Sequence, residues 1–145
     1  MEDIMRHIIV GCGSAAHGRG ELEEARRLGL FPGVCVHVIG FVDAAGCGAQ
    51  ATAFDYDRSI HHTVESHKQV ALDVFDKSDV TWDFQASHAP DLDAFTHAIR
   101  RYGRGCVIVT SLAGRHIRRE RSWMRLCRRL QCRLVIVDCA DHIEA

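Results

Sequence analysis

The sequence predicts an α/β fold of the doubly wound kind, in which a mostly parallel β-sheet carries helices on both faces. Apolar runs of four to nine residues, bounded by glycine or polar residues, alternate along the chain with segments of helical spacing. Strands that are apolar throughout are buried on both faces, and parallel strands are joined by helical crossovers. The composition, 47% hydrophobic and 26% charged in 145 residues, fits a single domain covering residues 1–145.

The first half of the chain contains two expected strands around a helix. The apolar run at 7–10 breaks at a pair of glycines, and residues 14–28 have the apolar spacing of a helix. Residues 34–42 (VCVHVIGFV) form the second buried strand, which closes at Asp43. Residues 44–59 are rich in glycine and alanine and then polar, so we expect a surface loop there.

The second half continues the alternation of helices and strands. Apolar residues recur at helical spacing in three segments, which short apolar or alternating runs separate. The expected helices cover 68–76, 91–102 and 116–131, and the expected strands cover 79–84, 106–110 and 134–137. In the last helix we expect Trp123 and Met124 to face inward and the arginines to face outward.

A glycine turn follows the first expected strand. The run Gly11-Cys12-Gly13-Ser14-Ala15-Ala16 matches G-x-G-x-x-G/A, in which glycines permit a tight turn and a close approach of the backbone to a pyrophosphate. The N–H groups of the following helix then face the phosphate. A strand-to-helix turn without a ligand is the alternative. The match indicates a Rossmann-type dinucleotide-binding domain with phosphate contacts from Gly11, Gly13, Ser14, Ala15 and Ala16.

Asp43 closes the second expected strand, near the position from which an acid accepts hydrogen bonds from the ribose hydroxyls of a dinucleotide. A carboxylate there would repel a 2′-phosphate, so the sequence favours NAD slightly over NADP as the cofactor. A solvated aspartate at a strand end is the alternative.

Four segments resemble the N-terminal nucleotide-binding domain of dihydrodipicolinate reductases, enzymes of the lysine and diaminopimelate pathway. The segments are IIVGCG, VIGFVD, DVTWDFQASHAPDLDAFTHAIRRYGRGCVIVTSL and RLVIVDCAD. In that family the ends of two strands line the nicotinamide side of the cofactor cleft, and the matching positions here are Phe84, Gln85, Thr110 and Ser111. The resemblance implies an NAD(P)-dependent oxidoreductase that transfers a hydride.

The chain also departs from that family. Gln85 replaces the usual threonine, Ser111-Leu112 replaces Thr-Gly, and the family's substrate domain has no counterpart. Hydride transfer requires both reactants to be held at close distance with water excluded. We therefore expect a cofactor half that is not catalytic unless a separate substrate domain or a homo-oligomer partner completes it. A domain that only senses or binds a nucleotide is one alternative, and a degenerate relative that no longer binds a nucleotide is a less favoured one.

The charges are unevenly distributed. Residues 1–99 carry seven basic and fifteen acidic side chains, whereas residues 100–133 carry eleven arginines and one acid. The arginine-rich helix at 115–129 could bind nucleic acid through phosphates. It offers few aromatic side chains for stacking on bases, so nucleic acid is not the favoured partner and a nucleic-acid-binding module is the second choice of function. A solvated outer face, or pairing with the acidic part of the chain or of a partner, is equally open.

The seven cysteines lie mostly within apolar runs, which favours reduced, buried thiols. Cys127, Cys132, Cys139 and His142 lack the close ligand pairs of structural zinc sites, so we expect no metal. Cys12 lies in the glycine turn at a helix N-terminus, which can lower a thiol pKa, although a small side chain that fills the turn is the favoured interpretation. No apolar stretch approaches the roughly 18–20 residues that cross a bilayer, and we expect a cytoplasmic protein without membrane contact.

Overall fold

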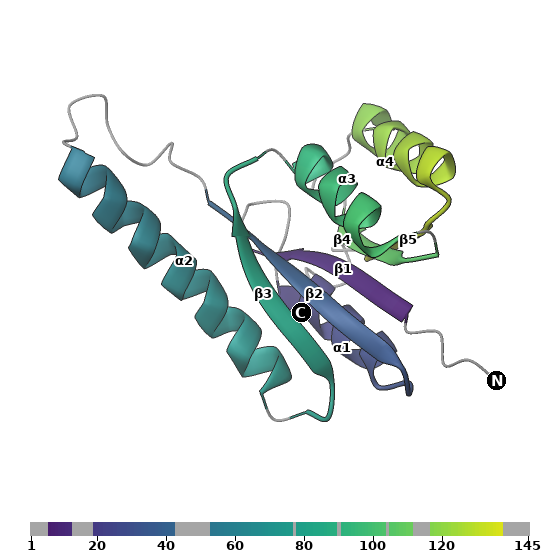
Figure 1. Cartoon of the computed structure of the whole chain (residues 1–145), viewed down its shortest axis with the longest axis horizontal. Helices are drawn as coiled ribbons and strands as arrows, with labels where there is room; N and C mark the ends of the chain where they lie inside the picture. The colour runs from purple at the N-terminus through teal and green to yellow at the C-terminus, as the bar shows by residue number, and fades with distance from the viewer. Residues whose placement is uncertain are drawn as a thin grey trace, which may run out of the picture.

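The computed structural model describes residues 6–12, 19–42, 53–76, 78–89, 91–103, 105–111 and 117–137. They form a five-stranded sheet with helices on both faces (Figure 1). The strands are β1 (Arg6–Cys12), β2 (Val34–Phe41), β3 (Thr81–Ser87), β4 (Val107–Ser111) and β5 (Arg133–Val137). All neighbouring strands are parallel, in the order β3-β2-β1-β4-β5. The predicted doubly wound α/β fold is therefore confirmed.

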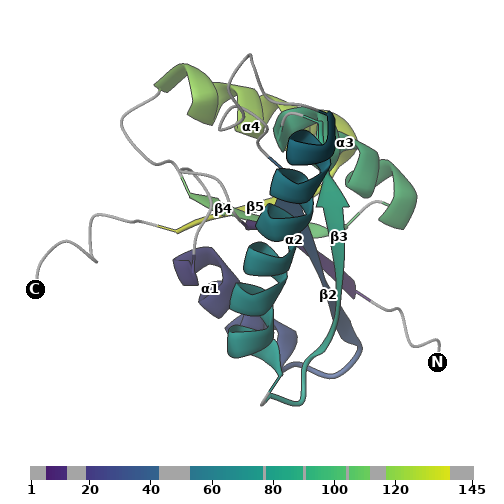
Figure 2. The same cartoon turned by 90° about the vertical axis from the view of Figure 1, so that its left-hand side faces the viewer.

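Each face of the sheet is covered by two of the described helices. α1 (Arg19–Gly29) and α2 (Ala53–Phe75) pack on one face, and α3 (Asp91–Tyr102) and α4 (Ile117–Leu130) pack on the other (Figures 1 and 2). Within the described segments, none of the helices combines the length and the apolarity required to span a lipid bilayer.

The central strand β1 contributes to both hydrophobic cores. Successive side chains of a strand point to opposite faces. Ile8 and Val10 therefore join the core with α1 and α2, whereas Ile9 joins the core with α3 and α4. Fully burying one side chain of this size contributes about 1.5–3 kcal/mol, so β1 anchors both layers of helices to the sheet.

Helix α2 is longer than the sequence indicates. It begins at Ala53, so the surface loop expected over 44–59 is wrong from that residue onward. The described side chains at 61–70 are exposed or half-buried, and the buried residues Ala71, Val74 and Phe75 come only in the last turns. Figure 1 shows the first turns of α2 extending past the sheet. Hydrophobic periodicity cannot reveal helical turns that bury no apolar stripe.

Gly29 ends α1 at a point where the helix packs tightly on the sheet layer. A Cβ on Gly29 would lie 2.8 Å from Cγ2 of Val36 and 2.9 Å from Cγ1 of Val80, and both valines are buried. Overpacking of this kind typically costs about 1–3 kcal/mol. We expect Gly29→Ala to lower the free energy of unfolding by that amount, measured by urea denaturation followed by circular dichroism.

A double-mutant cycle tests the cause of that loss. Val80→Ala removes two of the three methyl groups that the new Cβ would meet and leaves that of Val36, so Gly29→Ala should cost less in the Val80→Ala background than in the wild type. Equal costs in both backgrounds would contradict the close contact.

Candidate functional site

The direction of winding reverses between β1 and β4 in the middle of the sheet. After β1 the chain enters α1 on one face, and after β4 it continues to α4 on the other face. Ligands of open α/β sheets bind outside the carboxyl ends of the strands at such a reversal. Val10 pairs with Val109, and the residues that follow in each strand are Gly11–Cys12 and Thr110–Ser111. We call these four residues the switch point.

The switch point brings together only part of the predicted site. Gly11 and Thr110 are buried at the carboxyl ends of neighbouring strands, and Ser111 is the last residue of β4. The other predicted phosphate and ribose ligands, Gly13, Ser14, Ala15, Ala16 and Asp43, lie outside the described residues.

Phe84 and Gln85 do not lie beside Thr110 and Ser111. They belong to β3, which is the edge strand next to β2, so β2 and β1 separate them from β4. Three strand spacings of about 4.8 Å place β3 about 14 Å from β4. The expectation that both strand ends line one nicotinamide groove is wrong. The segment pairs with β2, with His37 opposite Asp83.

The two residues also point to opposite faces of the sheet. The Phe84 ring packs over Gly40 in the core with α1 and α2, where a Cβ on residue 40 would run into it. Gln85 is exposed and lines a pocket of about 280 Å³ between β3 and α3. Gln85 therefore remains available to a ligand, and Phe84 serves the core.

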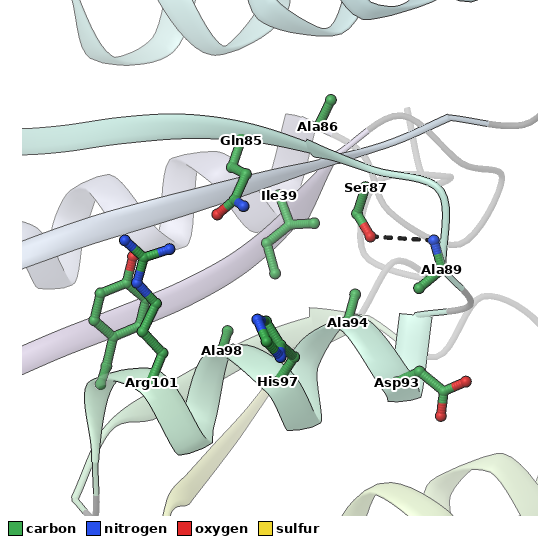
Figure 3. A pocket seen from close by; sticks show the side chains of 11 residues that line it. Ile39, Gln85, Ala86, Ser87, Ala89, Asp93, Ala94, His97, Ala98 and Arg101 are labelled. Carbon is green, nitrogen blue, oxygen red and sulfur yellow. Dashed lines mark hydrogen bonds between the residues drawn. The ribbon is translucent and has the colours of Figure 1, made fainter.

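Polar side chains of β3 and α3 border the pocket (Figure 3). Gln85 and His97 point into the space between the strand and the helix, while the Ser87 hydroxyl accepts a hydrogen bond of 3.2 Å from the Ala89 N–H. Arg101 lies at one end of the pocket, and Tyr102 also lines it. Of these residues, only Gln85 was predicted as a site residue from the sequence, because polar side chains on the solvent side of a helix carry no signal of a pocket.

Cys12 is a buried thiol rather than an activated one. Its Sγ donates a weak hydrogen bond to the His67 carbonyl oxygen at 3.7 Å. Burial, reinforced by the nearby Glu21 carboxylate, raises the pKa of the Cys12 thiol to about 11. The possibility that the glycine turn lowers this pKa is therefore wrong, and desolvation is the physical reason.

The outer face of α4 is cationic. Arg121, Arg125 and Arg128 are exposed around Met124. The side chain of Met124 is 46% exposed, so the expectation that it faces inward is wrong, whereas Trp123 is fully buried as expected. The described part of α4 thus presents arginines but no aromatic ring to solvent.

Two of the cysteines considered for zinc do approach each other. The Cys132 N–H donates to the Cys127 carbonyl at 3.0 Å, just after Gln131 turns the chain with a positive φ of 56°. The neighbouring Cys132 thiol lowers the pKa of the Cys127 thiol. Cys139 and His142 lie outside the described residues, so the quartet itself stays untested.

No protein-family model matches the chain, and no curated protein matches its sequence. Its fold is similar to that of universal stress proteins. The structure of UspA from Lactobacillus plantarum has a TM-score of 0.62 at 12% identity, covering 92% of this chain and 98% of that one. A universal stress protein in complex with cAMP has a TM-score of 0.52 at 14% identity, covering 91% and 96%. A universal stress protein family protein from Arabidopsis thaliana with AMP bound has a TM-score of 0.50 at 10% identity, covering 94% of each chain.

These neighbours correct the functional expectation. They are universal stress proteins and not dihydrodipicolinate reductases, and the ligands named with two of them are cAMP and AMP rather than NAD or NADP. The predicted family, the oxidoreductase function in lysine biosynthesis and the NAD(P) cofactor are therefore wrong. The residues behind the resemblance were a glycine turn and short apolar strand ends, and many doubly wound folds need both.

The pKa of Cys12 predicts slow alkylation. With a pKa of about 11 against an ordinary value of 9.0, the thiolate fraction at pH 8 falls about a hundredfold. We expect iodoacetamide to label Cys12 at least that much more slowly in the native than in the urea-unfolded protein, measured by mass spectrometry of the Cys12 peptide. The native rate should keep rising about tenfold per pH unit from 7 to 10. A plateau below pH 9 would contradict the buried, unactivated thiol.

Proposed function

We propose that this protein binds an adenine mononucleotide, with the phosphate at the switch point. The observation that carries the proposal is the reversal of winding between β1 and β4, which places the ends of these two neighbouring strands where doubly wound folds bind ligands. The fold similarity to universal stress proteins with cAMP or AMP bound supports the same class of ligand.

Groups suited to a phosphate come from both strands of the switch point. Gly11 lies next to the end of β1, and Gly13 to Ala16 follow it in the sequence, a pattern whose missing Cβ atoms let backbone N–H groups approach an anion. Thr110 and Ser111, the last two residues of β4, are of the hydroxyl-bearing type that can donate to a phosphate.

The adenosine end of the nucleotide would lie toward β2 and β3. Asp43 follows β2 in the sequence and is a candidate acceptor for the ribose hydroxyls. Gln85 offers both a donor and an acceptor, which suits the edge of an adenine base. Phe84 is not part of the proposed site, because its ring packs in the core over Gly40.

A charge introduced at the switch point tests the proposal. Ser111→Asp places a carboxylate beside the proposed phosphate, so we expect AMP, cAMP and ATP each to bind at least about tenfold more weakly, equivalent to about 1.4 kcal/mol. Isothermal titration calorimetry measures the dissociation constants at fixed ionic strength.

The matched control is Gln131→Asp. It adds the same charge at an exposed residue before β5, at the opposite end of the sheet, and its positive φ suits aspartate. Nucleotide affinity should stay within about twofold of the wild type, since a charge far beyond the Debye length is screened. Absence of nucleotide binding to the wild type at millimolar concentration, or equal affinities in all three proteins, would refute the proposal.

A further inference from the structure

A cluster of metal-ligating side chains lies on the face of the sheet that α3 and α4 cover. Cys35 and His37 are two residues apart in β2 and therefore point to the same face, and Asp83 is the residue of β3 directly opposite His37. The sulfur of Cys35, a ring nitrogen of His37 and a carboxylate oxygen of Asp83 all lie within 4.8 Å of one another. Among the described residues, no other three histidine, cysteine or acidic side chains are grouped in this way.

The cluster is closed on one side and open on the other. His37 is 6% exposed and Cys35 is 9% exposed. The Tyr102 ring stacks on the His37 ring, with the centroids 3.7 Å apart and the planes 11° apart, so the imidazole is fixed in orientation. Asp83 lies on the edge strand with its side chain 54% exposed. Solvent and ions therefore reach the cluster from the β3 edge.

Both ring nitrogens of His37 have partners. Nδ1 lies 2.8 Å from Oδ2 of Asp83, and Nε2 lies 2.8 Å from Nδ1 of His7. His7 belongs to β1, where it is opposite Cys35. Three neighbouring strands thus supply one continuous chain of polar side chains, His7 to His37 to Asp83, with the Cys35 thiol beside it.

We propose that Cys35, His37 and Asp83 bind a single transition-metal ion of the zinc type, and that His7 positions the imidazole. A thiolate, an imidazole and a carboxylate form a ligand set that favours zinc over magnesium or calcium. Metal-bound histidines usually donate the remaining ring N–H to an acceptor, which fixes the tautomer. With the metal on Nδ1, the Nε2–H of His37 donates to Nδ1 of His7, which already lies at hydrogen-bonding distance.

The required movements are small. Zinc–ligand bonds of about 2.0–2.3 Å in a tetrahedron separate the ligand atoms by about 3.3–3.6 Å. The Asp83 carboxylate must withdraw from its 2.8 Å contact with His37, and the most distant ligand atoms, now within 4.8 Å, must approach. Asp83 is free to move because its side chain is half exposed on an edge strand. Three protein ligands leave a fourth position for water on the exposed side.

Cobalt(II) tests the ligand set directly, because its spectrum reports both geometry and sulfur ligation. The full chain, stripped with a chelator and reduced, should bind one equivalent of Co²⁺ with a thiolate-to-cobalt charge-transfer band and the strong visible bands of a tetrahedral site. Zn²⁺ should abolish both. Cys35→Ser should remove the charge-transfer band, whereas Cys132→Ser, which alters a thiol pair elsewhere in the fold, should retain it. Loss of the band in Cys132→Ser but not in Cys35→Ser would overturn the proposal.

Affinity measurements test the other two residues, using competition for Zn²⁺ against a chromophoric chelator. Asp83→Asn should weaken binding about 10–100-fold, and the matched control Asp79→Asn, also exposed, should bind like the wild type. His7→Phe should weaken binding about tenfold while the cobalt charge-transfer band persists, and His7→Gln, which restores an acceptor, should recover most of the affinity.

Three further outcomes would refute the metal site: an unchanged affinity for Zn²⁺ in Asp83→Asn, an octahedral cobalt spectrum, or no binding of either ion at micromolar concentration. The Ser111→Asp titration changes the last residue of β4, which is not part of the metal cluster, so failure of one proposal leaves the other standing.

Discussion

The strand β1 must be buried on both faces, and the arrangement of the molecule depends on this requirement. Ile8 and Val10 require a helical layer on one face, and Ile9 requires a layer on the other. Parallel strands are joined by crossover connections. The connection after β1 therefore leads to one layer of helices, and the connection after β4 leads to the other. The reversal of winding, and with it the ligand position between the two strands, follows from the need to cover both faces of one apolar strand.

The two proposed sites lie near opposite ends of the parallel strands. The carboxyl ends of β1 and β4 hold Gly11, Thr110 and Ser111, residue types that suit the proposed nucleotide phosphate. Nearer the amino ends of β1 and β2, His7, Cys35 and His37 replace apolar residues on the α3 side. Buried polar groups are costly unless they are paired, and here the hydrogen-bonded chain to Asp83 pairs the two histidines. A parallel sheet thus has room for two independent sites on strands that are otherwise core.

The sequence resemblance failed for a physical reason. Buried parallel strands need runs of valine and isoleucine, and a turn that brings backbone close to a phosphate needs glycine, whichever nucleotide is bound. Phe84 and Gln85 matched a family pattern, yet β3 pairs with β2 and lies at the edge of the sheet, away from Thr110 and Ser111. A sequence pattern that reflects only the burial of strands identifies a fold class and cannot identify a cofactor.

The sequence by itself determined which segments are strands, that the sheet is parallel and doubly wound, and that residues such as Trp123 are buried, because these features depend on local apolar patterning. It did not reveal the first turns of α2, whose described side chains at 61–70 bury no continuous apolar stripe. Only the tertiary structure decided which strands are neighbours, and therefore which polar side chains meet. Cys35 and His37 are visible in the sequence as alternate residues of one strand. Their approach to Asp83 and His7, far away along the chain, arises from strand pairing, since backbone hydrogen bonds hold opposed residues of neighbouring strands about 5 Å apart.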